Sequence, residues 1–385
     1  MDAITIPAGE FTERIAKTRL AMQEKEIDLL LAFATESEPA YVRYFADYWP
    51  SFETAGVLIP ATNPESLLIG PESRTYAAAR SKISEVIRMM DFRESSQPAY
   101  PGSKLASWAE VLTAHRPKRL GIAGWHLIPH EIMLGVQAAL PGVEIINADD
   151  VVRSVMRTKS ANELQCLREA ARISELGFKA VLENIREGAT EAQLCGIATA
   201  AMLANGAEAT GYPIWCCSGP NSNQAISRPT HRKVQKGEVI HFSIGAKVAG
   251  YSASVGRPVV LGSCPDDLKA FLQVGLDAMT MTIDLMRAGA ISGEVARKVH
   301  GWIADQGYGH TILYGPAHGC GQMECEFPFL ESSSTFTLTE DMAFMVDVFL
   351  ADENRGFRWE DGIIVSEGAA EELSSFGSKL NILEV

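Results

Sequence analysis

The first part of the chain alternates short apolar runs with stretches of helical periodicity. Arg14 to Lys25 places its apolar residues on one side of a helix, and the run IDLLLAF from Ile27 to Phe33 is apolar throughout, as in a buried strand. The further predicted elements are strands at 56–59, 66–69 and 119–122 and a helix at 105–114. This order predicts a small α/β domain in which helices pack on a mixed sheet.

A new pattern begins near Arg157, where RTKSANELQCLREAARI opens a long helix. Ser160 and Glu163 have the spacing of a capping box, and Thr190 with Gln193 marks the start of a second helix in the same way. The remaining predicted elements are strands at 239–245, 251–261, 343–350 and 362–365 and helices at 266–286 and 293–306.

Length and composition agree with two folded domains. The chain has 385 residues, of which 46% are apolar and 21% are charged, as in ordinary globular proteins. We therefore predict an α/β (α+β) protein with one domain at 1–156 and a second at 157–385. The net charge of −14 argues against a nucleic-acid partner, because phosphate binding requires clustered Lys and Arg.

The same features predict a cytoplasmic protein without a membrane partner. The N-terminal segment has no basic region followed by an apolar run, so no signal peptide is predicted. No apolar stretch is long enough to span a bilayer. The seven cysteines, an odd number in a long chain, indicate reduced thiols rather than a disulfide framework.

Three residues of the second half are the strongest candidates for chemistry. His318 lies in the glycine-rich stretch GPAHGCGQ, where backbone can approach a ligand closely. Asp347 interrupts the apolar run MAFMVDVFL, and Glu360 precedes the apolar run of another predicted strand. A carboxylate in such a run is costly to bury unless it is paired or functional. The alternative for each residue alone is an ion pair that only supports the fold.

The order and spacing of these segments resemble the pita-bread family of creatinases, prolidases, Xaa-Pro aminopeptidases and methionine aminopeptidases. GYSASVGRP resembles the family's glycine-tyrosine hairpin, HGCGQMECEFP its histidine-glycine segment and RWEDGIIVSEG its final glutamate strand. RTKSANELQCLREA resembles its domain junction. The resemblance implies an N-terminal creatinase-type α/β domain, a C-terminal pita-bread catalytic domain, hydrolysis of a C–N bond and a homodimer.

The chain departs from the family's dinuclear peptidases at the hairpin. In those enzymes the hairpin supplies two Asp, which are followed by a His and two Glu. Ser243 and Ser254 occupy the two Asp positions, whereas His318, Asp347 and Glu360 match the later three. Neutral serines supply neither the charge nor the bridging that two divalent cations need, so the resemblance implies no dinuclear site. A single metal stays open, because one His and two carboxylates can hold one with open positions.

Other positions separate the chain from the family's metal-free members, creatinase and ectoine hydrolase. Glu360 matches a creatinase glutamate that grips a guanidinium group, but Gly256 stands where creatinase has its hairpin glutamate. Ile226 matches a histidine that contacts substrate in many members, and Cys325 matches the second histidine of the histidine-glycine segment. The resemblance therefore implies a substrate that differs from those of both enzymes.

We interpret the chain as a hydrolase of a C–N bond in a small zwitterionic or cationic substrate, without a cofactor. His318, Asp347 and Glu360 are the predicted catalytic residues, with His318 as general acid and base. The predicted substrate-binding residues are Ser243, Ser254, Arg257, Tyr314, Glu324 and Glu326. Two alternatives stay open: an Xaa-Pro aminopeptidase or dipeptidase with a single metal, and a catalytically inactive protein that binds peptides or metabolites.

Overall fold

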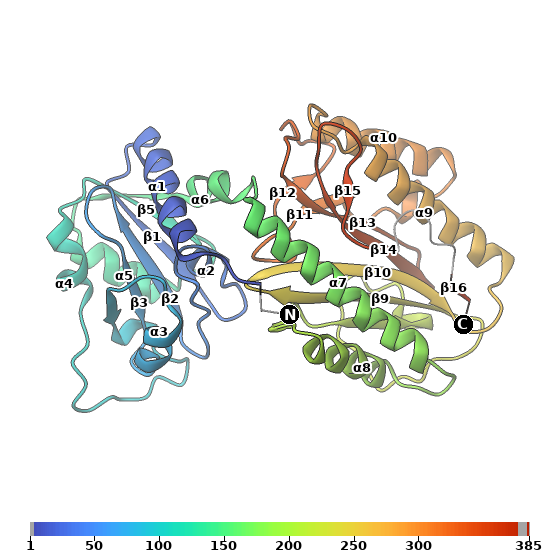
Figure 1. Ribbon diagram of the computed structural model, residues 1–385, viewed down its shortest axis with the longest axis horizontal. Coiled ribbons are helices and arrows are strands. Elements are labelled where there is room, and N and C mark those ends of the chain that lie inside the picture. The colour runs from blue at the N-terminus through green and yellow to red at the C-terminus, as the bar shows by residue number, and fades with distance from the viewer. Residues whose placement is uncertain (1–3, 376–382, 385) are drawn as a thin grey trace. The chain divides into compact units, whose positions relative to one another are not determined.

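The computed structural model describes residues 4–375 and 383–384. The chain forms two compact units, of which one is Ile6–Met156 and the other combines residues 4–5 with the chain from Arg157 onward (Figure 1). Each unit combines helices with a sheet, so the predicted α/β class is confirmed.

The first unit has a six-stranded mixed sheet in the order β4-β3-β2-β1-β5-β6. Its strands are β1 (Leu29–Ala34), β2 (Ala55–Pro60), β3 (Ser66–Ile69), β4 (Val86–Arg88), β5 (Arg119–Ala123) and β6 (Glu144–Asn147). Its α-helices are α1 (Ala8–Glu24), α2 (Ala40–Ala46), α3 (Arg74–Arg80), α4 (Trp108–Leu112), α5 (His130–Ala139) and α6 (Asp149–Met156). β1 pairs antiparallel with β2 and parallel with β5, as expected for a mixed sheet.

The strand predictions in this unit agree with the structure more closely than the helix predictions. The predicted helix at 105–114 begins only at Trp108, because Ser107 and Glu110 form a capping box at its start. The sequence pattern missed α2 altogether, since every residue of that helix is buried and no polar face reveals the helical period.

The second unit has a ten-stranded sheet. Its main path follows the order β12-β11-β13-β14-β10-β9-β7, while β8, β15 and β16 pair with β9, β14 and β10. The strands are β7 (Ala209–Thr210), β8 (Trp215–Ser218), β9 (Val239–Val248), β10 (Tyr251–Val260), β11 (Ala317–Gly319), β12 (Glu326–Leu330), β13 (Ala343–Ala351), β14 (Gly356–Ile364), β15 (Glu371–Glu372) and β16 (Leu383–Glu384). A tight turn at Ala249 and Gly250, both with positive φ, joins β9 to β10 and matches the twist of a hairpin.

Four long helices belong to this unit: α7 (Ala161–Asn184), α8 (Glu191–Ala204), α9 (Asp266–Leu285) and α10 (Ser292–Asp305). Both predicted capping boxes are confirmed, with Ser160 and Glu163 at the start of α7 and Thr190 and Gln193 at the start of α8. Within residues 4–375 and 383–384, none of the helices combines the length and apolarity that a bilayer crossing requires.

Helices α7 and α9 cover one face of the large sheet, and α7 runs along β9 and β10 (Figure 1). The ring of Phe242 in β9 lies 6.0 Å from Phe178 of α7, and the indole N–H of Trp359 in β14 donates to a carbonyl of α9. Side chains alternate between the faces of a strand. Ser243 and Glu360, which follow these aromatic residues, therefore point to the opposite face.

Strand β14 begins earlier than predicted, at Gly356 rather than 362. Its first half contains Arg358, Glu360 and Asp361, which break the apolar pattern that the prediction relied on. These charges are tolerated in a fully buried strand because they are paired: Asp361 with Arg257 at 2.7 Å, and Arg358 with Asp347 at 3.2 Å.

Alanine substitutions at two glycines test how the helices pack on the large sheet. A Cβ on Gly275 of α9 would collide with the ring of Phe357 and lie 2.7 Å from Cδ1 of Trp359. We expect Gly275→Ala to lower the free energy of unfolding by about 1–3 kcal/mol through overpacking. Gly301 of α10 is exposed with open space around it. Gly301→Ala should therefore raise the free energy of unfolding by about 0.5–1 kcal/mol through helix propensity. Urea unfolding measures both, and a stabilised Gly275→Ala variant would contradict this packing.

Candidate functional site

Four strands bring the candidate residues into one line across the large sheet. Ser243 of β9 lies opposite Gly256 of β10, Gly256 lies opposite Glu360 of β14, and Glu360 lies opposite Asp347 of β13. His318 of β11 pairs with the residue two positions before Asp347, so its side chain is on the same face. The antiparallel register therefore gathers residues that are up to 117 positions apart in the sequence.

The predicted catalytic residues His318, Asp347 and Glu360 form a buried cluster in which one ligand atom of each lies within 4.8 Å of the others. One oxygen of each carboxylate is already occupied. Ser243 Oγ donates to Glu360 Oε2 at 2.6 Å, and Tyr314 Oη donates to Asp347 Oδ2 at 2.7 Å. The other oxygens, Asp347 Oδ1 and Glu360 Oε1, are buried without a hydrogen-bond partner. Each carboxylate thus keeps one oxygen available for a ligand.

Negative charge exceeds permanent positive charge at this cluster. Glu324 lies 4.0 Å from His318 Nε2, so three carboxylates surround the centre. The guanidinium of Arg358 lies 3.2 Å from Asp347 Oδ2 and 3.8 Å from Glu360 Oε1. Burial, with the charge of Glu324, raises the pKa of Glu360 to about 7, and burial also raises the pKa of Asp347. A proton or a cationic ligand would relieve the surplus.

The environment of His318 favours the imidazolium form. Burial alone would lower its pKa, but a hydrogen bond with Cys325 and the charges of Glu324 and Asp347 raise the pKa well above the usual value. Nδ1 lies 3.1 Å from the Gly319 carbonyl, an acceptor, so Nδ1 is the protonated donor there. Nε2 therefore carries the second proton of the imidazolium and can bind a metal only in the neutral form.

Ser243 fixes Glu360 instead of supplying a metal-binding carboxylate. Its hydroxyl donates to Glu360, so Tyr212 Oη, at 2.5 Å, donates to Ser243. The bond between Ser243 and Glu360 passes over Gly256 of the strand between them. A Cβ on Gly256 would lie 2.7 Å from Glu360 Cβ and 3.0 Å from Glu360 Oε2. Ser254, at the other hairpin position, similarly donates to Glu324 at 3.0 Å. Both serines thus act as hydrogen-bond donors to carboxylates.

The structure places two of the predicted substrate-binding residues in ion pairs away from the cluster. Arg257 and Asp361 are fully buried and 2.7 Å apart, on the face of the sheet opposite to Glu360. Glu326 accepts a bond from Lys159 at 2.6 Å, so its charge is already compensated. The other four predicted residues, Ser243, Ser254, Tyr314 and Glu324, each bond or pair with the cluster or its neighbours.

Sequence reasoning missed Arg358 and Tyr212. Arg358 lies 5.1 Å above the ring of Trp215 and donates from Nη2 to Tyr314 Oη at 2.9 Å. Its position two residues before Glu360 could have indicated that Arg358 belongs to the site, because alternate residues of a strand share a face. Tyr212 lies outside every segment of the family resemblance, and no sequence signal connects it with Ser243.

Fold and site together define a two-domain protein of the creatinase–prolidase type. Residues 165–367 match the model of metallopeptidase family M24, and residues 14–156 match the creatinase/prolidase N-terminal domain. The chain belongs to metallopeptidase family M24, which confirms the resemblance seen in the sequence.

Similar proteins include both dipeptidases and a creatinase. The chain is 23% identical over 363 residues to an Xaa-Pro dipeptidase of Pyrococcus furiosus, covering 94% of this chain and 97% of that one. It is 24% identical over 401 residues to a creatinase of a Bacillus species (strain B-0618), with coverages of 99% and 94%. A solved prolidase from Thermococcus sibiricus matches with a TM-score of 0.85 at 20% identity, covering 97% and 99%. At that identity the structural match establishes the fold.

The residues present fit one metal ion but not two. Ser243 and Ser254 are neutral and donate their hydroxyl hydrogens to Glu360 and Glu324, so the hairpin offers no anionic ligand on this face. His318, Asp347 and Glu360 have ligand types and mutual distances suited to a single divalent cation. The unpartnered oxygens of the two carboxylates are consistent with such an ion.

His241 is a buried histidine next to this cluster. It lies two residues before Ser243 on β9 and therefore on the same face, with its ring 5.9 Å from that of Phe349. Neither ring nitrogen has a hydrogen-bond partner. Burial, with the nearby charge of Arg358, lowers the pKa of His241 to about 3. The imidazole is therefore neutral at ordinary pH.

This buried imidazole predicts a pH-dependent stability difference. Between pH 6.5 and 3 the unfolded chain protonates His241 and the folded chain does not, so stability falls as pH falls through this window. His241→Leu removes the effect and should stabilise the protein by about 2 kcal/mol more at pH 5 than at pH 8. Urea unfolding at the two pH values measures this difference. His130→Leu, at an exposed position in α5, is the control. An equal gain in stability in that variant would show that the pH dependence does not come from His241.

Proposed function

We propose that this protein hydrolyses a C–N bond in a small zwitterionic substrate, with His318, Asp347 and Glu360 at the reacting centre. The two buried carboxylate oxygens without partners support this proposal, because they lie at a centre with surplus negative charge. Membership of family M24 and the relatives named Xaa-Pro dipeptidase and creatinase support a hydrolase of C–N bonds.

The relatives named Xaa-Pro dipeptidase support an Xaa-Pro dipeptide as substrate, and the cluster of His318, Asp347 and Glu360 supports one divalent cation. With neutral His318, the charges of Glu324, Asp347, Glu360 and Arg358 add to −2, which one divalent cation balances. When bound there, such an ion polarises a carbonyl group and lowers the pKa of a bound water molecule.

The chain's own residues orient this centre. Tyr314 and Arg358 hold Asp347, and Ser243 holds Glu360, so neither carboxylate can turn freely when substrate binds. With an ion bound, His318 Nε2 would serve as a ligand; without one, the protonated Nε2 can give a proton to the leaving nitrogen, and the Gly319 carbonyl holds Nδ1 in both cases. Burial of all three central residues excludes bulk water and strengthens these contacts.

A second candidate is metal-free hydrolysis of a compound with a cationic nitrogen, which the two hairpin serines favour. If His318 is protonated, the same groups add to −1, and a single cationic nitrogen balances them. In this form Asp347 and Glu360 bind the cation, and His318 serves as general acid and base. Screening would then use creatine-like and ectoine-like compounds.

Metal content separates the two candidates. The protein is incubated with Mn²⁺, Zn²⁺ or Co²⁺, freed of excess ion and analysed by elemental mass spectrometry. We expect one ion per chain in the wild type and none in His318→Ala, because the imidazole is one of three ligands. A wild-type chain without bound ion would reject the first candidate, and two ions per chain would contradict the role of the hairpin serines.

Turnover tests the role of His318 in both candidates. His318→Ala should lower kcat about 100-fold or more, because a metal ligand is lost in the first candidate and a positioned acid in the second. The measurement uses Xaa-Pro dipeptides with Mn²⁺, and creatine-like and ectoine-like compounds without it. Thermal unfolding checks that the variant is folded, and His130→Ala provides an exposed control. Full activity of His318→Ala would refute the assignment.

A further inference from the structure

A loop of residues 219–231, called here the 219–231 loop, contacts the strands that form the site. It follows β8 and includes the short helix Gly219–Asn221. Its Ala225 carbonyl accepts a bond from Arg358 Nη2 at 2.9 Å, and Ser222 Oγ accepts one from the backbone N–H of Gly356 at 3.2 Å. The loop therefore bonds to β14 at two places, one of them the guanidinium beside Asp347.

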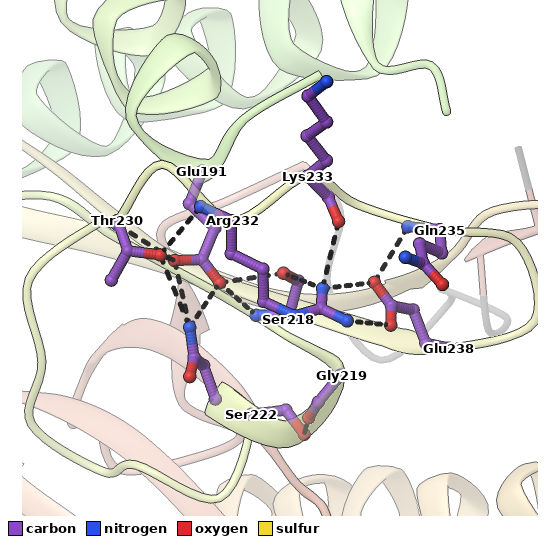
Figure 2. Close-up of polar contacts among 10 residues, drawn as sticks. Glu191, Ser218, Gly219, Ser222, Thr230, Arg232, Lys233, Gln235 and Glu238 are labelled. Atoms are coloured by element: carbon purple, nitrogen blue, oxygen red, sulfur yellow. Dashed lines mark hydrogen bonds and ion pairs between the residues drawn. The ribbon is translucent and has the colours of Figure 1, made fainter. Parts of the chain in front are cut away.

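A single carboxylate joins the two ends of this loop. Glu191, the first residue of α8, is fully buried and lies among polar groups of the loop and its flanks (Figure 2). It accepts bonds from the backbone N–H and hydroxyl of Ser218 at 2.9 and 2.8 Å, and from those of Thr230 at 3.0 and 2.6 Å. Asn221 Nδ2 adds a bond at 3.1 Å. Ser218 precedes the loop and Thr230 lies near its end.

The surroundings favour an ionised Glu191. Burial alone would raise its pKa, but the hydrogen bonds from Thr230 and Ser218 outweigh burial and hold the pKa below the usual value. Arg232 Nη1 donates to Ser218 Oγ at 2.7 Å and pairs with Glu238, as Figure 2 shows. All the groups that bond to Glu191 are donors, so a neutral amide in its place would leave some of them unpaired.

The guanidinium of Arg358 depends on the loop for its orientation. Its Nη2 has two acceptors, the Ala225 carbonyl and Tyr314 Oη, both at 2.9 Å. Its Nη1 lies near the carboxylates of Asp347 and Glu360. The guanidinium is planar and rigid, so the acceptors of one nitrogen fix the direction of the other. A displaced Ala225 would thus allow Nη1 to turn away from the centre.

We propose that Glu191 is a positioning residue of the site, acting through the 219–231 loop and Ala225 on Arg358. The proposal rests on the proposed function, because it assigns Arg358 to the reacting centre. Glu191 bonds to Ser218, Asn221 and Thr230, and its effect on Arg358 passes through the loop that carries Ala225. Loss of its charge should therefore change how well substrate is held.

The test compares Glu191→Gln with Glu163→Gln. Glu163 is also a buried carboxylate in the first turn of a helix, and it bonds to Ser160 and Tyr251. Kinetics on an Xaa-Pro dipeptide with Mn²⁺ should show KM raised about ten-fold and kcat changed much less in Glu191→Gln, because a buried charged hydrogen-bond network is broken. Glu163→Gln should keep the KM of the wild type.

Two further measurements need no substrate. Thermolysin should cleave the Ala225–Ile226 bond about ten-fold faster in Glu191→Gln, since Ile226 is 82% exposed and the loop is loosened. Nitrogen NMR of the Arg358 guanidinium, assigned with Arg358→Lys, should show separate Nη signals in the wild type and merged signals in Glu191→Gln. Thr230→Val, which removes one donor at an exposed position, should give smaller changes in the same direction if Glu191→Gln does not fold.

These results separate the two proposals. Absence of hydrolysis in the wild type would count against the proposed function, while the cleavage and NMR results would still decide the role of Glu191. The role of Glu191 would be overturned if both Glu191→Gln and Thr230→Val showed the cleavage rate and the guanidinium signals of the wild type. Equal changes in Glu163→Gln would also overturn it, because they would reflect general loss of stability.

Discussion

The close approach of three carboxylates, two of them beside Arg358, in a largely buried space is the constraint on which the site depends. Like charges at such distances repel strongly where water is excluded, and removing each from water has its own cost. The fold meets this constraint by surrounding Asp347, Glu360 and Glu324 with hydroxyl donors and one guanidinium. The compensation is incomplete, and the remaining field attracts a positive ligand. In a site of this kind, the charge of a ligand matters more for binding than its shape.

The large sheet provides the geometry for this arrangement. Helices α7 and α9 fill one face with aromatic and aliphatic side chains, which leaves the other face for polar groups. Antiparallel register fixes Ser243, Glu360 and Asp347 opposite one another within a rigid hydrogen-bonded frame. Such a frame holds these three side chains in fixed relative positions.

Much of the fold and the central cluster could be predicted from the sequence. Capping boxes at Ser160 and Thr190 and the apolar strands left clear local signals. His318 stood out in a glycine-rich stretch, and Asp347 and Glu360 stood out beside apolar runs. The partners of the charges could not be predicted, because pairing across strands depends on register. Arg257 and Glu326 show this limit: each has the residue type of a substrate ligand, yet Asp361 and Lys159 already compensate their charges.

The missing side chain at Gly256 couples three positions of the site. Because Glu360 lies across Gly256 to reach Ser243, a change at any one of these residues alters what the other two can be. An aspartate at position 243 alone would bring a further carboxylate against Glu360. Accommodating that charge would therefore need substitutions at other positions as well. The three positions constrain one another, and a single substitution among them would be disfavoured.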